Sequence, residues 1–154
     1  MKNKLISKIV IMTMLVSVGT TIIIPTISAK ANTLSNVENV VEKELVDFLK
    51  KYNLKESEMK DFMTSVSKDL NNPSMNEKGS VSTIKNALKI ILKYADKLPS
   101  WVSKPLKKLF GPLMAALDKV VDISLSGLKK IMISLGFNPT VAEFIIDIID
   151  LFFL

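Results

Sequence analysis

Apolar residues recur every three or four positions along most of the chain beyond residue 35, which is the spacing of amphipathic helices. The segment from Ser35 to Glu38 has the form of a capping box, and we expect a first helix to begin there and to end at Asn53. A second apolar stripe predicts a helix over residues 56–70. The two helices together predict a hairpin within residues 32–80.

The stretch 71–79 combines turn-forming and charged residues with almost no apolar ones, so it predicts a surface loop. A strongly two-faced helical pattern follows over residues 82–98, and Pro99 is expected to end it. We expect a short helix to restart near Ser103, because Pro105 is tolerated in a first turn but not farther inside a helix.

The Gly-Pro pair at 111–112 is expected to break the chain again. Beyond it, the apolar spacing predicts one longer helix over residues 113–135, loosened at the Ser-Gly pair 126–127. Gly136 is a natural C-cap in the left-handed conformation. The Asn-Pro pair at 138–139 then supplies an N-cap and a first-turn proline for a final helix over residues 140–154.

This final helix is apolar almost all round, apart from one narrow acidic stripe formed by Glu143, Asp147 and Asp150. Such a helix belongs inside a bundle or against a membrane. We expect the carboxylates to be solvated or to pair with lysines of the preceding segment. A divalent-cation site is the disfavoured alternative, since such sites also draw ligands from loops and carbonyl groups. The stripe also argues against a helix that spans the bilayer.

No stretch of the chain shows a convincing strand alternation. The predicted fold is therefore all-α, a compact bundle of five to six short amphipathic helices.

Residues 1–31 have the layout of a secretory signal peptide: lysines at the start, an apolar run, and a small-residue cleavage site that ends at Ala31. The apolar run is too short for a comfortable transmembrane helix, which needs about 20 apolar residues. We expect cleavage near Ala31 and a secreted, extracellular protein. The alternative is a leader that is kept as a membrane anchor.

The residue types present exclude several kinds of chemistry. The chain contains no cysteine, histidine, arginine or glutamine, so it lacks a thiolate nucleophile, the commonest general base and the bidentate phosphate fork. It has no phosphate-binding glycine loop and no metalloprotease motif. We therefore expect neither an enzyme nor a cofactor or metal site, and nucleic acid is not an expected partner.

Charge divides the chain beyond the leader into three parts. Residues 32–80 carry seven lysines and nine acids, residues 81–137 carry ten lysines and three acids, and residues 138–154 carry three acids alone. The acidic hairpin of 32–80 suggests a pro-segment that masks the cationic and apolar region 81–154 until the loop between them is cut. The alternative is a single continuous domain that is never processed.

Lysines that lie opposite a continuous apolar arc suit a helix that lies in a membrane interface. The lone tryptophan suits the headgroup level, although a packing role between two helices is the blander interpretation. Likewise, the lysines of an ordinary soluble bundle only solvate its outside. The candidate membrane-binding residues are Lys85, Lys89, Lys93, Trp101, Lys104, Lys107 and Lys108.

The sequence Ile-Lys-Asn-Ala-Leu-Lys-Ile-Ile-Leu-Lys at 84–93, Trp101, and the Pro-Leu-Lys-Lys-Leu-Phe stretch at 105–110 resemble the leaderless and circular, saposin-like bacteriocins of Gram-positive bacteria. The resemblance covers about residues 81–137 and includes no defining motif. It implies a lysine-rich helical bundle that disrupts membranes without enzyme activity. The chain differs from those peptides in its leader and in its acidic hairpin.

Two functions follow as expectations. The first is a secreted membrane-active protein, an antimicrobial or toxin, that adsorbs to anionic lipid membranes and inserts apolar helix faces, with self-association possible. The second is a secreted, non-enzymatic helical protein that binds a protein or cell-wall partner.

Overall fold

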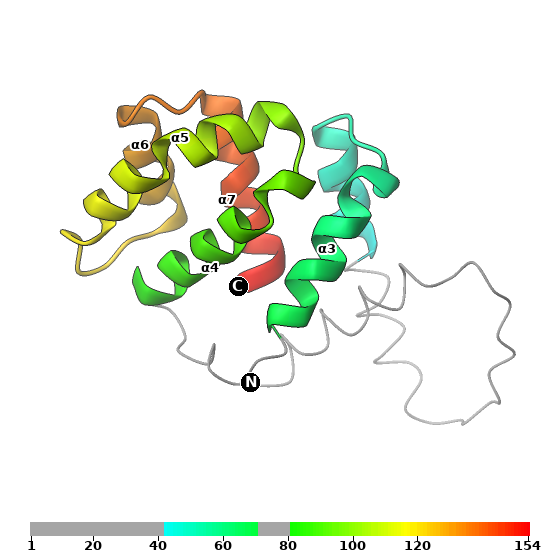
Figure 1. Ribbon diagram of the computed structural model, residues 1–154, viewed down its shortest axis with the longest axis horizontal. Helices are drawn as coiled ribbons and strands as arrows, with labels where there is room; N and C mark the ends of the chain where they lie inside the picture. The colour runs from blue at the N-terminus through cyan, green and yellow to red at the C-terminus, as the bar shows by residue number, and fades with distance from the viewer. Residues whose placement is uncertain (1–41, 71–80) are drawn as a thin grey trace, which may run out of the picture.

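The computed structural model describes residues 42–70 and 81–154, which are helical apart from short connections (Figure 1). A helix covers residues 42–51, and the elements that follow are α3 (Glu56–Leu70), α4 (Val81–Lys93), the 3-10 helix η2 (Ala95–Lys97), α5 (Ser100–Leu117), α6 (Leu125–Ser134) and α7 (Pro139–Phe153). No strand occurs in these two ranges, so the all-α prediction is confirmed. The predicted leader, capping box and 71–79 loop lie outside the described residues.

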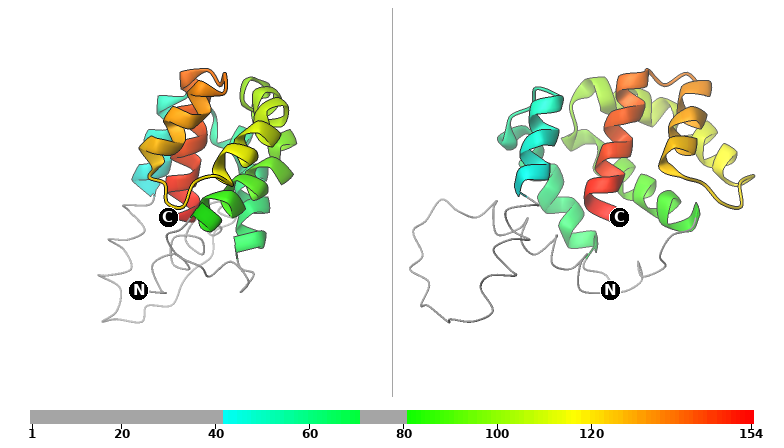
Figure 2. Two further views of the ribbon diagram at one scale, coloured as in Figure 1. Left: turned by 90° about the vertical axis from the view of Figure 1, so that its left-hand side faces the viewer. Right: turned by 180° about the vertical axis from the view of Figure 1, so that it is seen from behind.

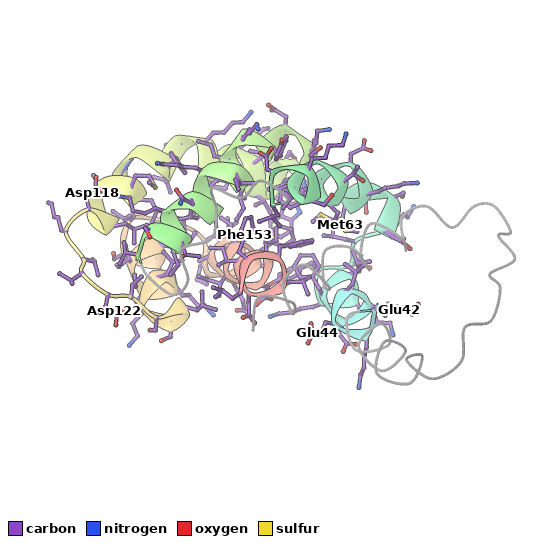
Figure 3. The ribbon with its side chains drawn as sticks, turned by 90° about the horizontal axis from the view of Figure 1, so that it is seen from below. Glu42, Glu44, Met63, Asp118, Asp122 and Phe153 are labelled. Carbon is purple, nitrogen blue, oxygen red and sulfur yellow. The ribbon has the colours of Figure 1, made fainter. Side chains whose placement is uncertain are left out.

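The helices form two layers, which are seen edge-on in the left view of Figure 2 and again in Figure 3. Helix 42–51, α6 and α7 make one layer, which we call the α7 layer. The other contains α3, α4, η2 and α5, and we call it the α4–α5 layer. Between described residues the chain passes from one layer to the other at residues 52–55 and at residues 118–124.

Helix α7 lies at the centre of the molecule and contacts α4, α5 and α6 (Figure 1). Eight of its fifteen residues are buried, because its composition leaves few polar side chains to face water. Its start follows the local signals in the sequence. Asn138 accepts a hydrogen bond from the Thr140 N–H at 2.9 Å, Pro139 occupies the first turn, and Gly136 has a φ of +99°. The predicted caps are confirmed.

The end of helix 42–51 and the start of α3 match the sequence prediction. Asn53 adopts the left-handed conformation, with a φ of +51°, and its N–H donates to the carbonyl of Lys50 at 3.1 Å. The α3 bounds match the predicted 56–70. A side-chain oxygen of Glu58 accepts a hydrogen bond from the Lys55 N–H at 2.7 Å, which satisfies one of the free amides at the start of this helix.

Residues 42–70 and 81–154 share one hydrophobic core. The ring of Phe48 lies 5.2 Å from that of Phe144, and Phe62 meets Phe152 edge-on at 6.2 Å. From α3 the core also takes Met59, Met63 and Val66. The described part of the predicted hairpin therefore covers apolar faces of the later helices.

The prediction of a helix that restarts near Ser103 and breaks at 111–112 is wrong. Helix α5 begins at Ser100 and continues through both Pro105 and Pro112 to Leu117.

Tertiary burial explains why α5 survives its two prolines. One face of the helix is buried along its whole length by Val102, Leu106, Leu113 and Leu117. Each proline removes a backbone donor, and the carbonyls that lose a partner are those of Trp101 and Lys108. Both residues are exposed, so water can hydrate the two carbonyl groups. Continuous packing on one face thus outweighs the local cost on the other.

Two other predicted boundaries are wrong. The helix predicted over 82–98 ends at Lys93 and is followed by η2, while Leu98 is extended, with ψ 156°, because a residue before proline avoids the helical region. The helix predicted over 113–135 is instead divided by residues 118–124. There Ser124 caps α6 by accepting from the Gly127 N–H at 3.1 Å, and such side-chain bonds compete with continued helix.

We expect the substitution Phe144→Ala to lower the free energy of unfolding by about 3–5 kcal/mol. The substitution leaves a cavity where α7, α5 and helix 42–51 meet. Urea unfolding of the leader-free chain, residues 32–154, measures this loss. Val121→Ala is the matched control, since Val121 is 96% exposed and should change stability by less than about 0.5 kcal/mol. Equal effects of the two substitutions would contradict the described core.

Candidate functional site

A surface rich in lysine covers the outside of α4, η2 and α5. Residues 81–117 contain seven lysines and only one acidic residue, Asp96. Their apolar residues face the core, so the lysines are left on the outer side of the α4–α5 layer. We call this surface the lysine face, and its members are Lys85, Lys89, Lys93, Lys97, Lys104, Lys107 and Lys108. Lys97 belongs to it although it is absent from the predicted site.

Three of these lysines form ion pairs with carboxylates of their own layer: Lys85 with Asp118, Lys93 with Asp69, and Lys107 with Asp96. The ammonium of Lys93 lies 2.7 Å from the Asp69 carboxylate and 5.0 Å from the centre of the Tyr94 ring. The hydrogen bond to Asp69 raises the pKa of Lys93. These pairs reduce the charge that the lysine face presents to a ligand.

The remaining lysines of this face are more available. Lys89, Lys97, Lys104 and Lys108 are exposed, and within the described residues none of them forms an ion pair. They are distributed over α4, η2 and α5, so the net positive charge extends over these three elements. A cationic surface spread over three elements suits an extended anionic surface better than one small anion.

Trp101 lies at the edge of the lysine face, where the two layers meet. Its ring packs edge-on against Phe144 at 5.1 Å and tilted against Tyr52 at 6.2 Å. It is nevertheless 39% exposed, one turn before Lys104. The side chain therefore both fills the junction between the layers and offers part of its ring to the surroundings.

The acidic stripe of α7 is bound by cations from both neighbouring helices. Lys51 lies 2.6 Å from Glu143 and 2.8 Å from Asp147, and Lys129 of α6 reaches Glu143 at 2.9 Å. The hydroxyl of Tyr52 donates to Asp147 at 2.7 Å. We call these five residues the α7 clasp. The expected pairing with a lysine of the preceding segment is confirmed by Lys129. Lys51 and Tyr52 could not be identified as partners from the sequence, because it does not reveal that helix 42–51 lies beside α7.

The clasp shifts the pKa values of Lys51, Tyr52 and Glu143. Hydrogen bonds from Lys51 and Lys129 lower the pKa of Glu143 from 4.5 to about 2. The same network raises the pKa of Lys51, chiefly through its bond to Asp147. Burial, followed by the bond to Asp147, raises the pKa of Tyr52. Glu143 and Lys51 therefore stay charged over the whole physiological pH range.

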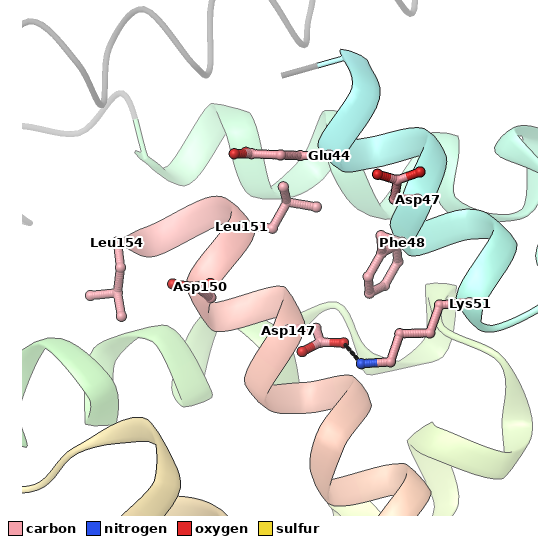
Figure 4. Close-up of a pocket in the computed structure, with 8 residues that line it drawn as sticks. All are labelled: Glu44, Asp47, Phe48, Lys51, Asp147, Asp150, Leu151 and Leu154. Atoms are coloured by element: carbon pink, nitrogen blue, oxygen red, sulfur yellow. Dashed lines mark hydrogen bonds and ion pairs between the residues drawn. The ribbon is translucent and has the colours of Figure 1, made fainter. Parts of the chain in front are cut away.

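An open groove of about 500 Å³ runs between helix 42–51 and the end of α7 (Figure 4). Its rim carries four carboxylates against one lysine, and Figure 4 shows the Lys51 ammonium turned toward Asp147. Three apolar side chains contribute to its surface. The lining residues are Glu44, Asp47, Phe48, Lys51, Asp147, Asp150, Leu151 and Leu154. The α7 layer thus carries an acidic groove, whereas lysines dominate the outer side of α4, η2 and α5.

No helix within residues 42–70 and 81–154 combines the length and the apolar composition needed to cross a membrane. The same ranges hold no group of three or more acidic side chains placed to bind a metal ion.

Comparison with known proteins reveals no relative: the chain matches no protein-family model, no curated protein and no solved structure. What the molecule does must be inferred from its own surfaces.

We expect carbon-detected NMR titration to place the pKa of Glu143 near 2, and the substitution Lys51→Met to move it up toward 4.5, because its strongest hydrogen-bond donor is lost. Lys43→Met is the control, since Lys43 is exposed on the same helix and takes no part in the clasp. An unchanged pKa in Lys51→Met would show that Lys51 does not hold Glu143 in solution.

The same shift predicts how stability depends on pH. Since the pKa of Glu143 is lower in the folded protein than in the unfolded chain, its ionised form stabilises the fold above about pH 4.5, and this contribution is lost as the pH falls through about 2. We expect Glu143→Gln to be less stable than the parent at pH 7 by at most about 1 kcal/mol, because the pairs are half-exposed. Urea unfolding should show this difference vanish by about pH 2.

Proposed function

We propose that this chain is a secreted, membrane-active helical protein that adsorbs to anionic membranes through the lysine face and then inserts apolar helix faces. The observation that carries the proposal is the composition of the α4–η2–α5 surface, with seven lysines and one acid, set opposite a layer that carries the acidic groove. Such a distribution orients the molecule as it approaches a negative surface.

Electrostatics alone gives only weak binding. A lysine near an anionic membrane contributes about 1 kcal/mol, so the four lysines without ion pairs, Lys89, Lys97, Lys104 and Lys108, contribute about 4 kcal/mol together. That corresponds to a millimolar dissociation constant. Stable attachment therefore requires apolar surface as well, as it does for interfacial helices in general.

The apolar surface is present but covered. The inner faces of α4 and α5 are buried against α7, and Val102, Leu106, Leu113 and Leu117 are fully or almost fully inaccessible. Exposing them to water costs free energy, whereas exposing them to acyl chains does not. The protein therefore stays closed in water and opens only at the lipid surface.

Several features support a toxin-like or antimicrobial role. Residues 1–31 have the layout of a secretory signal peptide, and residues 84–110 resemble lysine-rich bacteriocins of Gram-positive bacteria. Adsorption and insertion need no catalytic residue and no cofactor. The mechanism thus uses only what this chain supplies, namely lysines and apolar helix faces.

The groove between helix 42–51 and α7 favours a second candidate function. A secreted, non-enzymatic binding protein could accept a cationic protein partner there, with carboxylates at the rim and apolar contacts from Phe48, Leu151 and Leu154. This alternative predicts a stable monomer without affinity for lipid.

We expect the triple substitution of Lys89, Lys104 and Lys108 by Glu to weaken binding to phosphatidylglycerol vesicles by about 100-fold or more, since three charges of about 1 kcal/mol each are reversed. Sedimentation with vesicles measures the bound fraction of the leader-free chain. These three lysines are chosen because they take part in no described ion pair, so their reversal should leave the fold intact.

The matched control reverses three exposed lysines of the α7 layer, Lys43, Lys50 and Lys130, and thus makes the same change in net charge. Binding should fall far less in this variant. Equal losses in both variants would show that net charge matters and the lysine face does not. Dye release from phosphatidylglycerol but not phosphatidylcholine vesicles would support membrane activity, and the absence of both binding and release would favour the protein-binding alternative.

A further inference from the structure

The ion pairs of the described residues lie within the two layers and not between them. Three join the members of the α7 clasp, and the other three join lysines of the lysine face to carboxylates of α3, η2 and the end of α5. None of these six pairs links one layer to the other. Polar attraction between these side chains therefore holds each layer together separately.

Apolar contacts join the two layers. The rings of Trp101 and Phe144 meet at 5.1 Å, and those of Phe62 and Phe152 meet at 6.2 Å. Helices α4 and α5 pack on α7 through side chains that are buried and uncharged. Separating this interface costs least in lipid, because acyl chains can cover the apolar surfaces that water cannot.

Chain connectivity permits the layers to separate. Between described residues the chain crosses from one layer to the other at 52–55 and at 118–124. Neither of these two segments contains helix. Asn53, in the first crossing, has a left-handed φ of +51°. Val121, in the second, is 96% exposed, while Val120 and Ile123 of the same segment are partly buried against the core. Two short connections can change direction while the helices on either side stay intact.

We propose that the protein opens at an anionic membrane by separating the α7 layer from the α4–α5 layer, with residues 53–55 and 119–124 as hinges, and with the α7 clasp and the Lys85–Asp118 pair kept closed. This inference rests on the proposed membrane function and specifies which contacts break.

The alternative movements cost more polar contacts. Releasing α7 alone breaks the bonds of Lys51, Tyr52 and Lys129 to its carboxylates, and it moves Glu143 and Asp147 toward an anionic surface without their counter-charges. Releasing α4 alone breaks its pairs with Asp118 and Asp69. Separating the layers breaks none of the six ion pairs. It also turns two amphipathic surfaces toward the lipid, each with its charges already on the outer side.

Pulsed electron–electron double resonance measures the distance between two spin labels and distinguishes these movements. Because the chain contains no cysteine, labelling at two introduced cysteines is specific. Exposed positions are available in both layers: Val46 and Ile133 in the α7 layer, and Ser57 and Ala115 in the α4–α5 layer. We expect phosphatidylglycerol vesicles to lengthen the distances across the layers, 46–115 and 57–133, by at least one helix diameter, about 10 Å. The distances within the layers, 46–133 and 57–115, should change by less than half of that.

Each outcome has a definite meaning. Cross-layer lengthening with constant within-layer distances supports the proposed plane of opening. Binding to vesicles without cross-layer lengthening, or with equal lengthening of all four distances, overturns it and leaves the proposed function standing. No binding to vesicles overturns both.

The substitution Lys51→Met tests the role of the clasp in the same assay. Helix 42–51 then loses its ion pairs to α7, so the 46–133 distance should lengthen on vesicles, while the 57–115 distance remains as in the parent. The control Lys43→Met should behave as the parent. An unchanged 46–133 distance in Lys51→Met would show that the clasp does not hold the α7 layer together.

Discussion

The burial of α7 governs the rest of the structure. This helix has apolar side chains on every side except the narrow stripe of Glu143, Asp147 and Asp150, so it has to be covered from several directions at once. Helices α4 and α5 cover one side, α6 covers another, and Phe48 of helix 42–51 closes a third through Phe144. The two-layer arrangement follows, because one central helix cannot be enclosed by a single hairpin.

The same constraint determines where the charges lie. The Glu143 carboxylate of α7 is half-buried between two helices, and it stays ionised because hydrogen bonds from Lys51 and Lys129 lower its pKa. Those cations belong to the α7 layer and neutralise it locally. In the opposite layer, lysines outnumber the nearby carboxylates, so a positive surface remains after every described pair is formed. The charge asymmetry of the molecule is thus linked to its core.

The sequence predicted correctly those helix caps and helix bounds that depend on neighbouring residues. The caps at Gly136 and Asn138 and the bounds of α3 depend on residues within a few positions of each other, and the sequence contains all of them. The course of α5 through Pro112 depends on burial against other helices, which outweighs the proline penalty and cannot be read locally. The lysines of the candidate face were identifiable from their spacing. The three lysines that form ion pairs were not identifiable, because each comes close to its partner, Asp69, Asp96 or Asp118, only in the folded chain.

The separation of polar and apolar contacts bears on the choice between the two candidate functions. A protein that only presents a rigid surface to a partner gains from polar links between its layers, since these fix their relative position. In the described residues, the six ion pairs lie within the layers, and aromatic ring packing connects one layer to the other. Apolar packing is strong in water and loses its driving force in lipid. A bundle joined in this way is stable in water and loses the driving force for its interlayer contacts in lipid, an arrangement that supports the proposed membrane activity over passive binding.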